Sequence, residues 1–80
     1  MKVYVVISSS IINDHESNGL HGVYTTKSSA KNTAISAIKS IAQRYYRNIN
    51  TSDICEDGLE FSYQNGTMDI CVSCLEEEVR

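Results

Sequence analysis

LEFSYQNGTMDICV, residues 59–72, is the stretch that decides the fold. The Asn65-Gly66 pair predicts a two-residue hairpin turn, because both central residues of such a turn must accept φ > 0. The resulting register places Tyr63 opposite Met68, Phe61 opposite Ile70 and Leu59 opposite Val72. One face of the hairpin is then wholly apolar and the other is mostly polar. Because a slip by one residue would reverse these faces, the pattern specifies an antiparallel pair with one buried side.

Working outward, the chain shows four strand patterns, at residues 2–8, 22–26, 59–64 and 67–77. The first has apolar side chains on both faces, which is typical of a strand in the middle of a sheet. Residues 9–21 are expected to form a polar loop, which either folds over an edge of the sheet or extends the strands on either side. Residues 49–57 are expected to form an acidic loop.

One helix is expected between the second and third strands. Its N-cap is Ser28 or Ser29, with Thr26 as an alternative, and it runs to about Asn48. Apolar side chains recur at helical spacing and form the predicted buried stripe. They are Ala30, Ala34, Ala37, Ile38, Ile41 and Tyr45.

The order of elements predicts an α+β fold, a ββαββ two-layer sandwich in which one helix packs on a four-stranded, mainly antiparallel sheet. Residues 1–80 form a single domain of this kind. The first and last strands are the longest and most apolar, so they are expected side by side in the centre, in the order 2-1-4-3. This arrangement leaves five side chains on the sheet face that the helix does not cover, namely Tyr4, Val6, Tyr24, Cys71 and Leu75.

Composition favours a cytoplasmic globular protein. The chain is 41% hydrophobic, and its longest apolar run, residues 3–7, is far shorter than a membrane-spanning helix requires. No signal peptide is expected, and three cysteines without one are read as reduced thiols. The net charge of −3 is unevenly placed, because residues 17–52 hold five cations and no acid. Such segregation can steer a charged partner.

The Cys71-Val72-Ser73-Cys74 motif is expected to be structural. Residues three apart on a strand point to opposite faces, so the two sulfur atoms diverge and share neither zinc nor a disulfide. A loop containing Asp14, His15, Glu16 and His21 has no spacing typical of a metal site. We therefore expect no metal, no cofactor and no catalytic residue.

Two segments resemble a pattern in small proteins of bacteriophages and bacterial mobile elements. They are KVYVV, residues 2–6, and GVYTTKSSA, residues 22–30. In those proteins a first strand and a loop lead to Gly-Val-Phe/Tyr-Ser/Thr and then to a helix with an early Ala. Their final strand ends in acidic residues, much as residues 70–78 do here. Members with known roles commonly bind and block host enzymes or defence systems, including CRISPR and restriction machinery, and the resemblance implies such a role.

The sequence therefore predicts a non-enzymatic phage-type binding protein that blocks a host defence protein by occupying its surface, in the host cytoplasm if it is phage-encoded. The alternatives are a self-assembling, homodimeric structural domain and a nucleic-acid-binding module that uses the basic helix. Overall acidity makes nucleic acid the less favoured partner. A membrane partner is not expected. The predicted partner-binding residues are Tyr4, Val6, Tyr24 and Leu75 on the sheet, and Lys31, Lys39, Arg44 and Arg47 on the helix.

Overall fold

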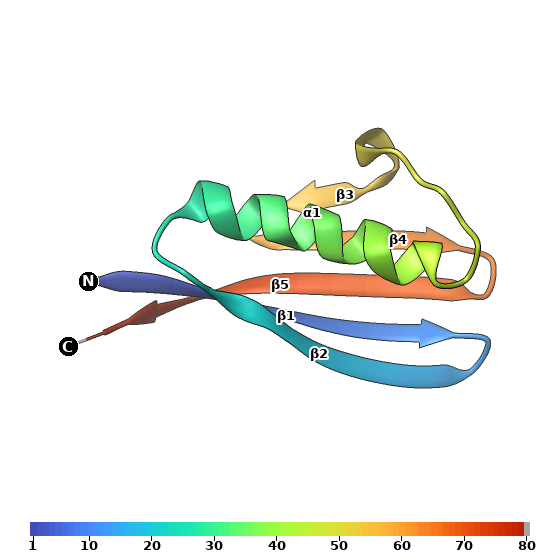
Figure 1. The fold of residues 1–80 in the computed structure, drawn as a ribbon, viewed down its shortest axis with the longest axis horizontal. Helices are drawn as coiled ribbons and strands as arrows, with labels where there is room; N and C mark the ends of the chain where they lie inside the picture. The colour runs from blue at the N-terminus through green and yellow to red at the C-terminus, as the bar shows by residue number, and fades with distance from the viewer. Residues whose placement is uncertain (80) are drawn as a thin grey trace.

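Five antiparallel strands and one α-helix make up residues 1–79, the part of the chain that the computed structural model describes (Figure 1). The strands are β1 (Lys2–Ile12), β2 (His15–Tyr24), β3 (Cys55–Asp57), β4 (Glu60–Asn65) and β5 (Met68–Glu78). Helix α1 spans Lys27–Gln43, and a short 3-10 helix, η1 (Thr51–Asp53), precedes β3. The expected four-stranded ββαββ sandwich is therefore wrong, because part of the expected acidic loop forms a fifth strand.

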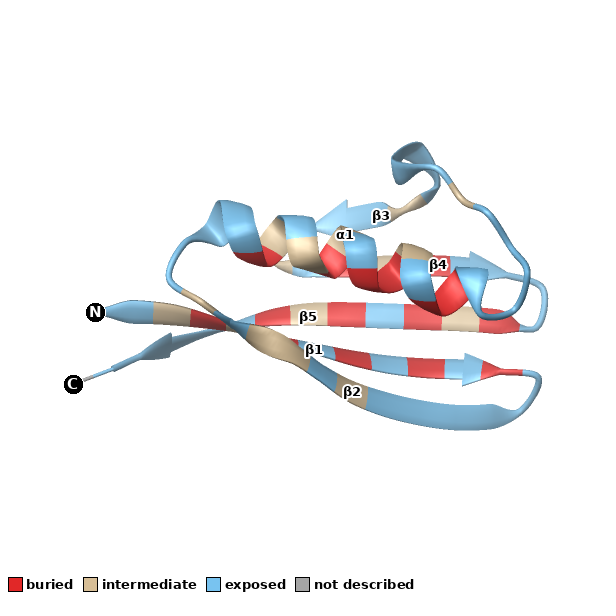
Figure 2. Cartoon of the chain, in the orientation of Figure 1, coloured by how far each residue is buried: buried red, intermediate tan, exposed pale blue. Residues whose placement is uncertain are grey.

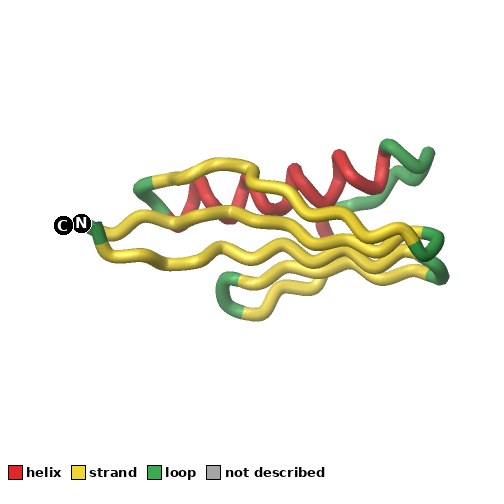
Figure 3. Tube along the Cα trace, turned by 90° about the horizontal axis from the view of Figure 1, so that it is seen from below, coloured by secondary structure: helices red, strands yellow, loops and turns green. Residues whose placement is uncertain are grey.

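The strand order is β2-β1-β5-β4-β3. Strands β1 and β5 occupy the centre side by side, as their length and apolar content predicted, and β3 adds to the edge beside β4. Figure 3 shows the strands as one layer, with α1 along one side of it. Two partly buried side chains, Ile49 and Ile54, pack against the core and hold the connection from α1 to β3.

Residues 9–21 are not a loop. They continue β1 and begin β2, joined by a turn at Asn13 and Asp14, which both have positive φ angles of 51° and 68°. Two positive φ angles at the centre of a two-residue connection are what a type I′ hairpin turn requires, and Asn and Asp tolerate them better than most residues. Of the two alternatives for this segment, extension of the flanking strands is the one found.

The 59–72 hairpin forms, but its turn lies one residue later than expected. Asn65 pairs with Met68, so the two central residues are Gly66, with φ 59°, and Thr67. Glycine at the first central position is the requirement of a type II′ turn, which competes with type I′ at such sequences. The cross-strand partners move by two positions, so that Tyr63 faces Ile70. A shift of two preserves the side-chain alternation, and the predicted apolar face is correct.

Helix α1 begins after Thr26, the alternative cap, whose hydroxyl accepts a hydrogen bond from the backbone N–H of Ser29 at 3.2 Å. The helix ends at Gln43, not at Asn48. The chain leaves it through Tyr46, which has a left-handed φ of 61°. The N–H of Arg47 then bonds to the carbonyl of Ala42, as in a Schellman motif.

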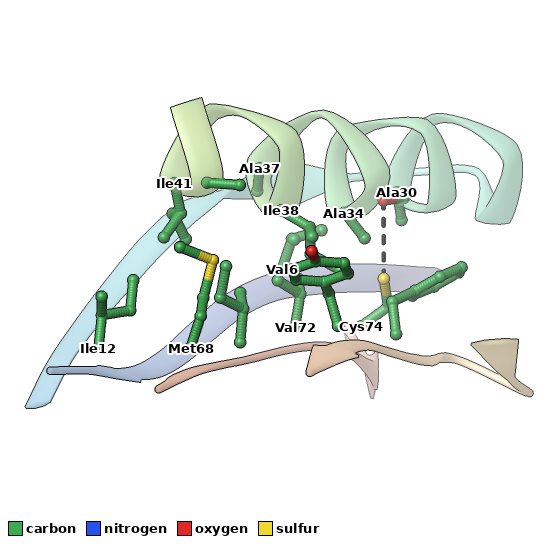
Figure 4. Close-up of a cluster of buried hydrophobic side chains, with 14 of the residues drawn as sticks. Val6, Ile12, Ala30, Ala34, Ala37, Ile38, Ile41, Met68, Val72 and Cys74 are labelled. Carbon is green, nitrogen blue, oxygen red and sulfur yellow. Dashed lines mark hydrogen bonds between the residues drawn. The ribbon is translucent and has the colours of Figure 1, made fainter. Parts of the chain in front are cut away.

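The core lies between α1 and one face of the sheet. Figure 2 shows buried and exposed residues alternating along β1 and β5, with the buried ones under the helix. Figure 4 shows Val6, Val72 and Cys74 beneath the small side chains Ala30 and Ala34, which let the helix approach closely. The predicted helix stripe is confirmed except at Tyr45, which is exposed, while Ala42 is buried in its place.

The predicted uncovered face is wrong for Tyr4 and Val6. Both are buried under α1, Val6 completely, and Tyr24 is half-buried against the same core. The reason is the pairing of β1 with β5, which places Val6 beside Cys74 and Tyr4 beside Glu76. In β5 the buried residues are the even-numbered Met68, Ile70, Val72 and Cys74, so the even-numbered row of β1 must share the core. Cys71 and Leu75 do lie on the uncovered side.

Candidate functional site

The sheet face away from α1, called the open face below, carries a row of apolar side chains. Val5 lies between Val23 of β2 and Leu75 of β5 in the register of the sheet, and Ile7 pairs with Leu20. Leu20 is 69% exposed, and Val23, Leu75, Ile7 and Ile11 are also exposed. An apolar group of this extent on so small a domain is typical of an interaction surface.

A shallow hollow of about 480 Å³ lies within the open face. Side chains of Ile7 and Leu20 line one part of it, and Cys71 and Ser73 of β5 line the other. The hollow exists because small side chains on β5 stand beside large ones on β1. Its size and apolar walls suit the insertion of one large apolar side chain.

Carboxylates lie at both ends of this apolar row and on its β3–β4 side. Side-chain alternation places five acids on the open face, and they are Glu16, Asp57, Glu60, Asp69 and Glu77. The five strands contain one lysine, Lys2, and no arginine. Lys2 belongs to the opposite row and pairs with Glu76 at 3.0 Å. The open face therefore combines an apolar centre with a negative border.

The predicted basic residues lie on the helix layer instead. Lys31 forms an ion pair with Glu56 at 2.8 Å, and Lys39 donates a hydrogen bond to the hydroxyl of Thr51 at 2.7 Å. Both contacts tether the 44–57 connection to the helix. Arg44 and Arg47 are exposed beyond the end of α1. The cations that are segregated in the sequence thus lie on the helix layer, and the acids border the open face of the sheet. Of the predicted partner-binding residues, only Leu75 reaches the open face.

The two cysteines of the CxxC motif point to opposite faces, as the strand alternation predicted. Cys74 is buried and donates to the carbonyl of Ala30 at 3.6 Å, whereas Cys71 is exposed on the open face. Burial, together with Asp69, raises the pKa of Cys71 above its ordinary value. Because the thiolate is the reactive form of cysteine, this environment does not activate Cys71 as a nucleophile.

A second feature, which the sequence did not reveal, lies on the helix side of β2. The sheet register shifts between Val6 and Ile7, so that His21 bulges out of β2. Its Nε2 atom lies 2.7 Å from the hydroxyl of Ser8, which is buried. Gly22, with φ 134°, allows the Tyr24 ring to lie against the bulge. Only the strand register reveals this pair, because His21 looked like part of a loop.

The pair borders a groove between α1 and β2. Ser8, Ser10, Gly19, His21 and Arg44 line a hollow of about 320 Å³ there. No carboxylate lines it among the described residues, so nothing orients the imidazole in the manner of a catalytic triad.

Within residues 1–79 no three histidine, cysteine or acidic side chains come together in a way that could hold a metal ion. The described part of the chain also has no helix that is both long and apolar enough to cross a bilayer.

Comparison with known proteins yields one family. A family model described as "Domain of unknown function (DUF7336)" matches residues 1–70, which include β1 to β4 and α1. No curated protein and no solved structure matches the chain.

Proposed function

This chain belongs to the DUF7336 family, a domain of unknown function whose model covers β1 to β4 and ends within β5, and we propose from the surface of its sheet that it is a non-enzymatic binding domain. It acts by placing the open face against a partner protein. The role does not require a catalytic set, since the surface itself is the functional element.

The observation that carries the proposal is the orientation of β1. Its two rows are unequal. The row on the open face contains Val3, Val5, Ile7 and Ile11 with one serine, Ser9. The row under the helix contains Tyr4, Val6 and Ile12 with two serines, Ser8 and Ser10. Burial of the more apolar row would stabilise the fold more, by about 25 cal/mol for each Å² removed from water. Local choices that oppose stability are concentrated at functional sites, and a partner would bury the exposed row.

The acidic border defines the partner's chemistry. A complementary surface presents one large apolar side chain to the hollow and Lys or Arg around it. Electrostatic complementarity of this kind gives specificity and raises the association rate at low salt. The further expectation that the partner is a host defence protein is supported only by the resemblance to phage and mobile-element proteins.

A second copy is the alternative occupant of the open face. Two open faces stacked about a two-fold axis would turn their carboxylate borders toward each other, and like charges at close range oppose association. Sedimentation equilibrium of the wild type at two salt concentrations tests this. A salt-independent dimer dispersed by Leu20→Asp would assign the face to self-association.

The proposal is tested by partner capture from a bacterial lysate with matched variants. Leu20→Asp changes an exposed residue at the hollow, and Arg47→Glu is the control on the helix layer. We expect wild type and Arg47→Glu to retain a specific protein that Leu20→Asp loses, and retention to fall with salt. Thermal unfolding must show that Leu20→Asp is folded. Equal retention by all three proteins would contradict docking through the open face.

A further inference from the structure

The groove between α1 and β2 opens on the helix side of the sheet, and it adjoins the hollow of the open face, with which it shares Ser8, Asn18, Gly19 and Leu20. Its floor contains Ser8 and Ser10, which are 8% and 6% exposed and stand in the row between the core residues Val6 and Ile12. Serines at such positions contribute less to a core than apolar side chains do. Ser10 has only a long contact, 3.5 Å, with the carbonyl of Ser17. The packing of the core therefore does not explain why hydroxyl groups occupy the floor of the groove.

Hydroxyl groups line the groove from both walls. Ser17 of β2 adds to those of the floor, and an adjoining hollow of about 280 Å³ continues along the helix beside Thr33, Ser36 and Ser40. The two hollows share His21 and Arg44. The lining of both contains no carboxylate, so Arg44 provides a positive field that no lining acid cancels. A site of this composition attracts an anion and hydrogen-bonds to polar groups attached to it.

The absence of a side chain at Gly19 leaves space in the groove beside Ser8 and His21. A Cβ atom at this position would lie 3.3 Å from the Ser8 hydroxyl and 3.5 Å from Nε2 of His21. When Nε2 carries a proton, it donates to Ser8, whose own hydroxyl proton is then available to a ligand. Hydrogen-bond donors therefore line the groove on its floor, on β2 and at the end of the helix. A tetrahedral oxyanion accepts hydrogen bonds from several directions, whereas a planar carboxylate accepts them largely in one plane.

We propose that this groove binds a small phosphorylated polyol, with the phosphate between Arg44 and His21 and the polyol along the hydroxyl-lined wall of α1. The site goes beyond partner docking, and the two side chains that place the phosphate, Arg44 and His21, do not line the hollow of the open face.

The test is an NMR titration of the ¹⁵N-labelled full chain with ribose 5-phosphate, and with ribose, inorganic phosphate and acetate for comparison. We expect saturable shifts of the Gly19 and His21 amides with ribose 5-phosphate, weaker ones with inorganic phosphate, and still weaker ones with ribose or acetate. Arg44→Gln should weaken binding at least tenfold. Arg47→Gln, which removes a cation that lines neither hollow, should leave it unchanged.

Several outcomes would overturn the assignment. Shifts spread over Lys27, Lys31 and Lys39 would mean diffuse screening of charge, and so would equal losses in the two arginine variants. Acetate binding as tightly as phosphate would reassign the groove to carboxylates. Tighter binding of single-stranded dT8 than of ribose 5-phosphate would make the ligand a nucleic acid. Gly19→Ala offers a second check, since it fills the groove floor without removing charge and should also abolish the shifts.

Discussion

Tyr46 ends helix α1 in a backbone conformation that is unfavourable for a residue with a side chain. Its φ of 61° lies in the left-handed region, and its side chain is 99% exposed, so no packing compensates for the strain. The position is C′ of a Schellman motif, where glycine is usual. We predict that Tyr46→Gly stabilises the fold by roughly 0.5–1 kcal/mol, measured by urea unfolding.

The matched control for this change is Gln43→Gly, also exposed but in the last turn of α1 itself. It should destabilise by about 1 kcal/mol, because glycine is unfavourable inside a helix. Destabilisation by both variants would mean that the left-handed conformation of Tyr46 carries no strain in solution.

Cys74 makes stability depend on pH in the alkaline range. Burial raises the pKa of its thiol above the ordinary value of 9.0, and nearby Lys31 opposes this. The folded state therefore keeps the proton more tightly than the unfolded chain does. The contribution is fully present below pH 9 and is lost as the pH rises through the folded-state pKa. Cys74→Ala should give a shallower fall in the free energy of unfolding between pH 8 and 10, by urea titration at each pH.

The exposed thiol of Cys55 provides the comparison for that experiment. Cys55→Ala is the control variant, because it removes an exposed thiol and leaves Cys74 in place. A slope that Cys74→Ala leaves unchanged would assign the alkaline loss to other groups, such as Cys71, whose pKa is also raised.

At the scale of elements, the bulge in β2 depends on Gly22. A Cβ atom there would approach the Tyr24 hydroxyl to 2.9 Å, and φ is 134°. Gly66, in the β4–β5 turn, has φ 59° and nothing within 4 Å. We predict that Gly66→Ala costs about 1 kcal/mol, the conformational penalty alone. Gly22→Ala should cost clearly more, because the ring of Tyr24 must also move.

Thermal unfolding of the two alanine variants measures this difference. A Gly22→Ala variant as stable as Gly66→Ala would show that Tyr24 does not pack on the bulge. The hydrogen bond from the Tyr24 hydroxyl to the carbonyl of His21, 3.2 Å long, is the contact that the movement would break.

The sequence was most informative where alternation was strong. The 59–72 hairpin has one apolar and one polar face, and these faces were predicted correctly even though the turn lies at Gly66 and Thr67. The first hairpin was only one of two alternatives for residues 9–21, because its turn, Asn13-Asp14, lacks glycine and its strands are rich in serine. A polar edge strand such as β2 is extended because it pairs with β1. This pairing is not encoded in the local sequence.

The faces of β1 were assigned wrongly for a different reason. Both of its rows are partly apolar, and the odd-numbered one, with Val5 and Ile7, is the better candidate for a core. The pairing with β5 decides the orientation, and this is a long-range property. An uncovered face could therefore be predicted to exist, but of its residues only Cys71 and Leu75 on β5 were assigned correctly. The groove at Ser8 and His21 was equally hidden, since the bulge that creates it depends on register.

At the scale of the whole molecule, the two layers differ in solution behaviour. The open face exposes apolar side chains that contribute little to the core, so polar substitution there should be tolerated. We predict that Ile7→Thr with Leu20→Ser changes the free energy of unfolding by less than about 1 kcal/mol. The double variant should also show weaker self-attraction by static light scattering.

Val6→Ser is the buried counterpart in the same strand, at 0% exposure. It should destabilise by about 2–4 kcal/mol, because it removes a packed side chain and buries a hydroxyl. Comparable losses in the two proteins would mean that the apolar row of the open face also belongs to a core.

The central pairing of β1 with β5, in which Lys2 lies opposite Glu78, has a kinetic consequence. Closing a loop that includes nearly all of the domain costs conformational entropy before any contact offsets it. Folding rates fall as such distant contacts dominate. The hairpins and α1 can form early from local contacts. The sheet acquires its centre only when β5 docks. On the ribosome β5 emerges after the other described elements, so the apolar side of β1 stays uncovered in a nascent chain until then, and we expect chaperones to bind this domain during synthesis.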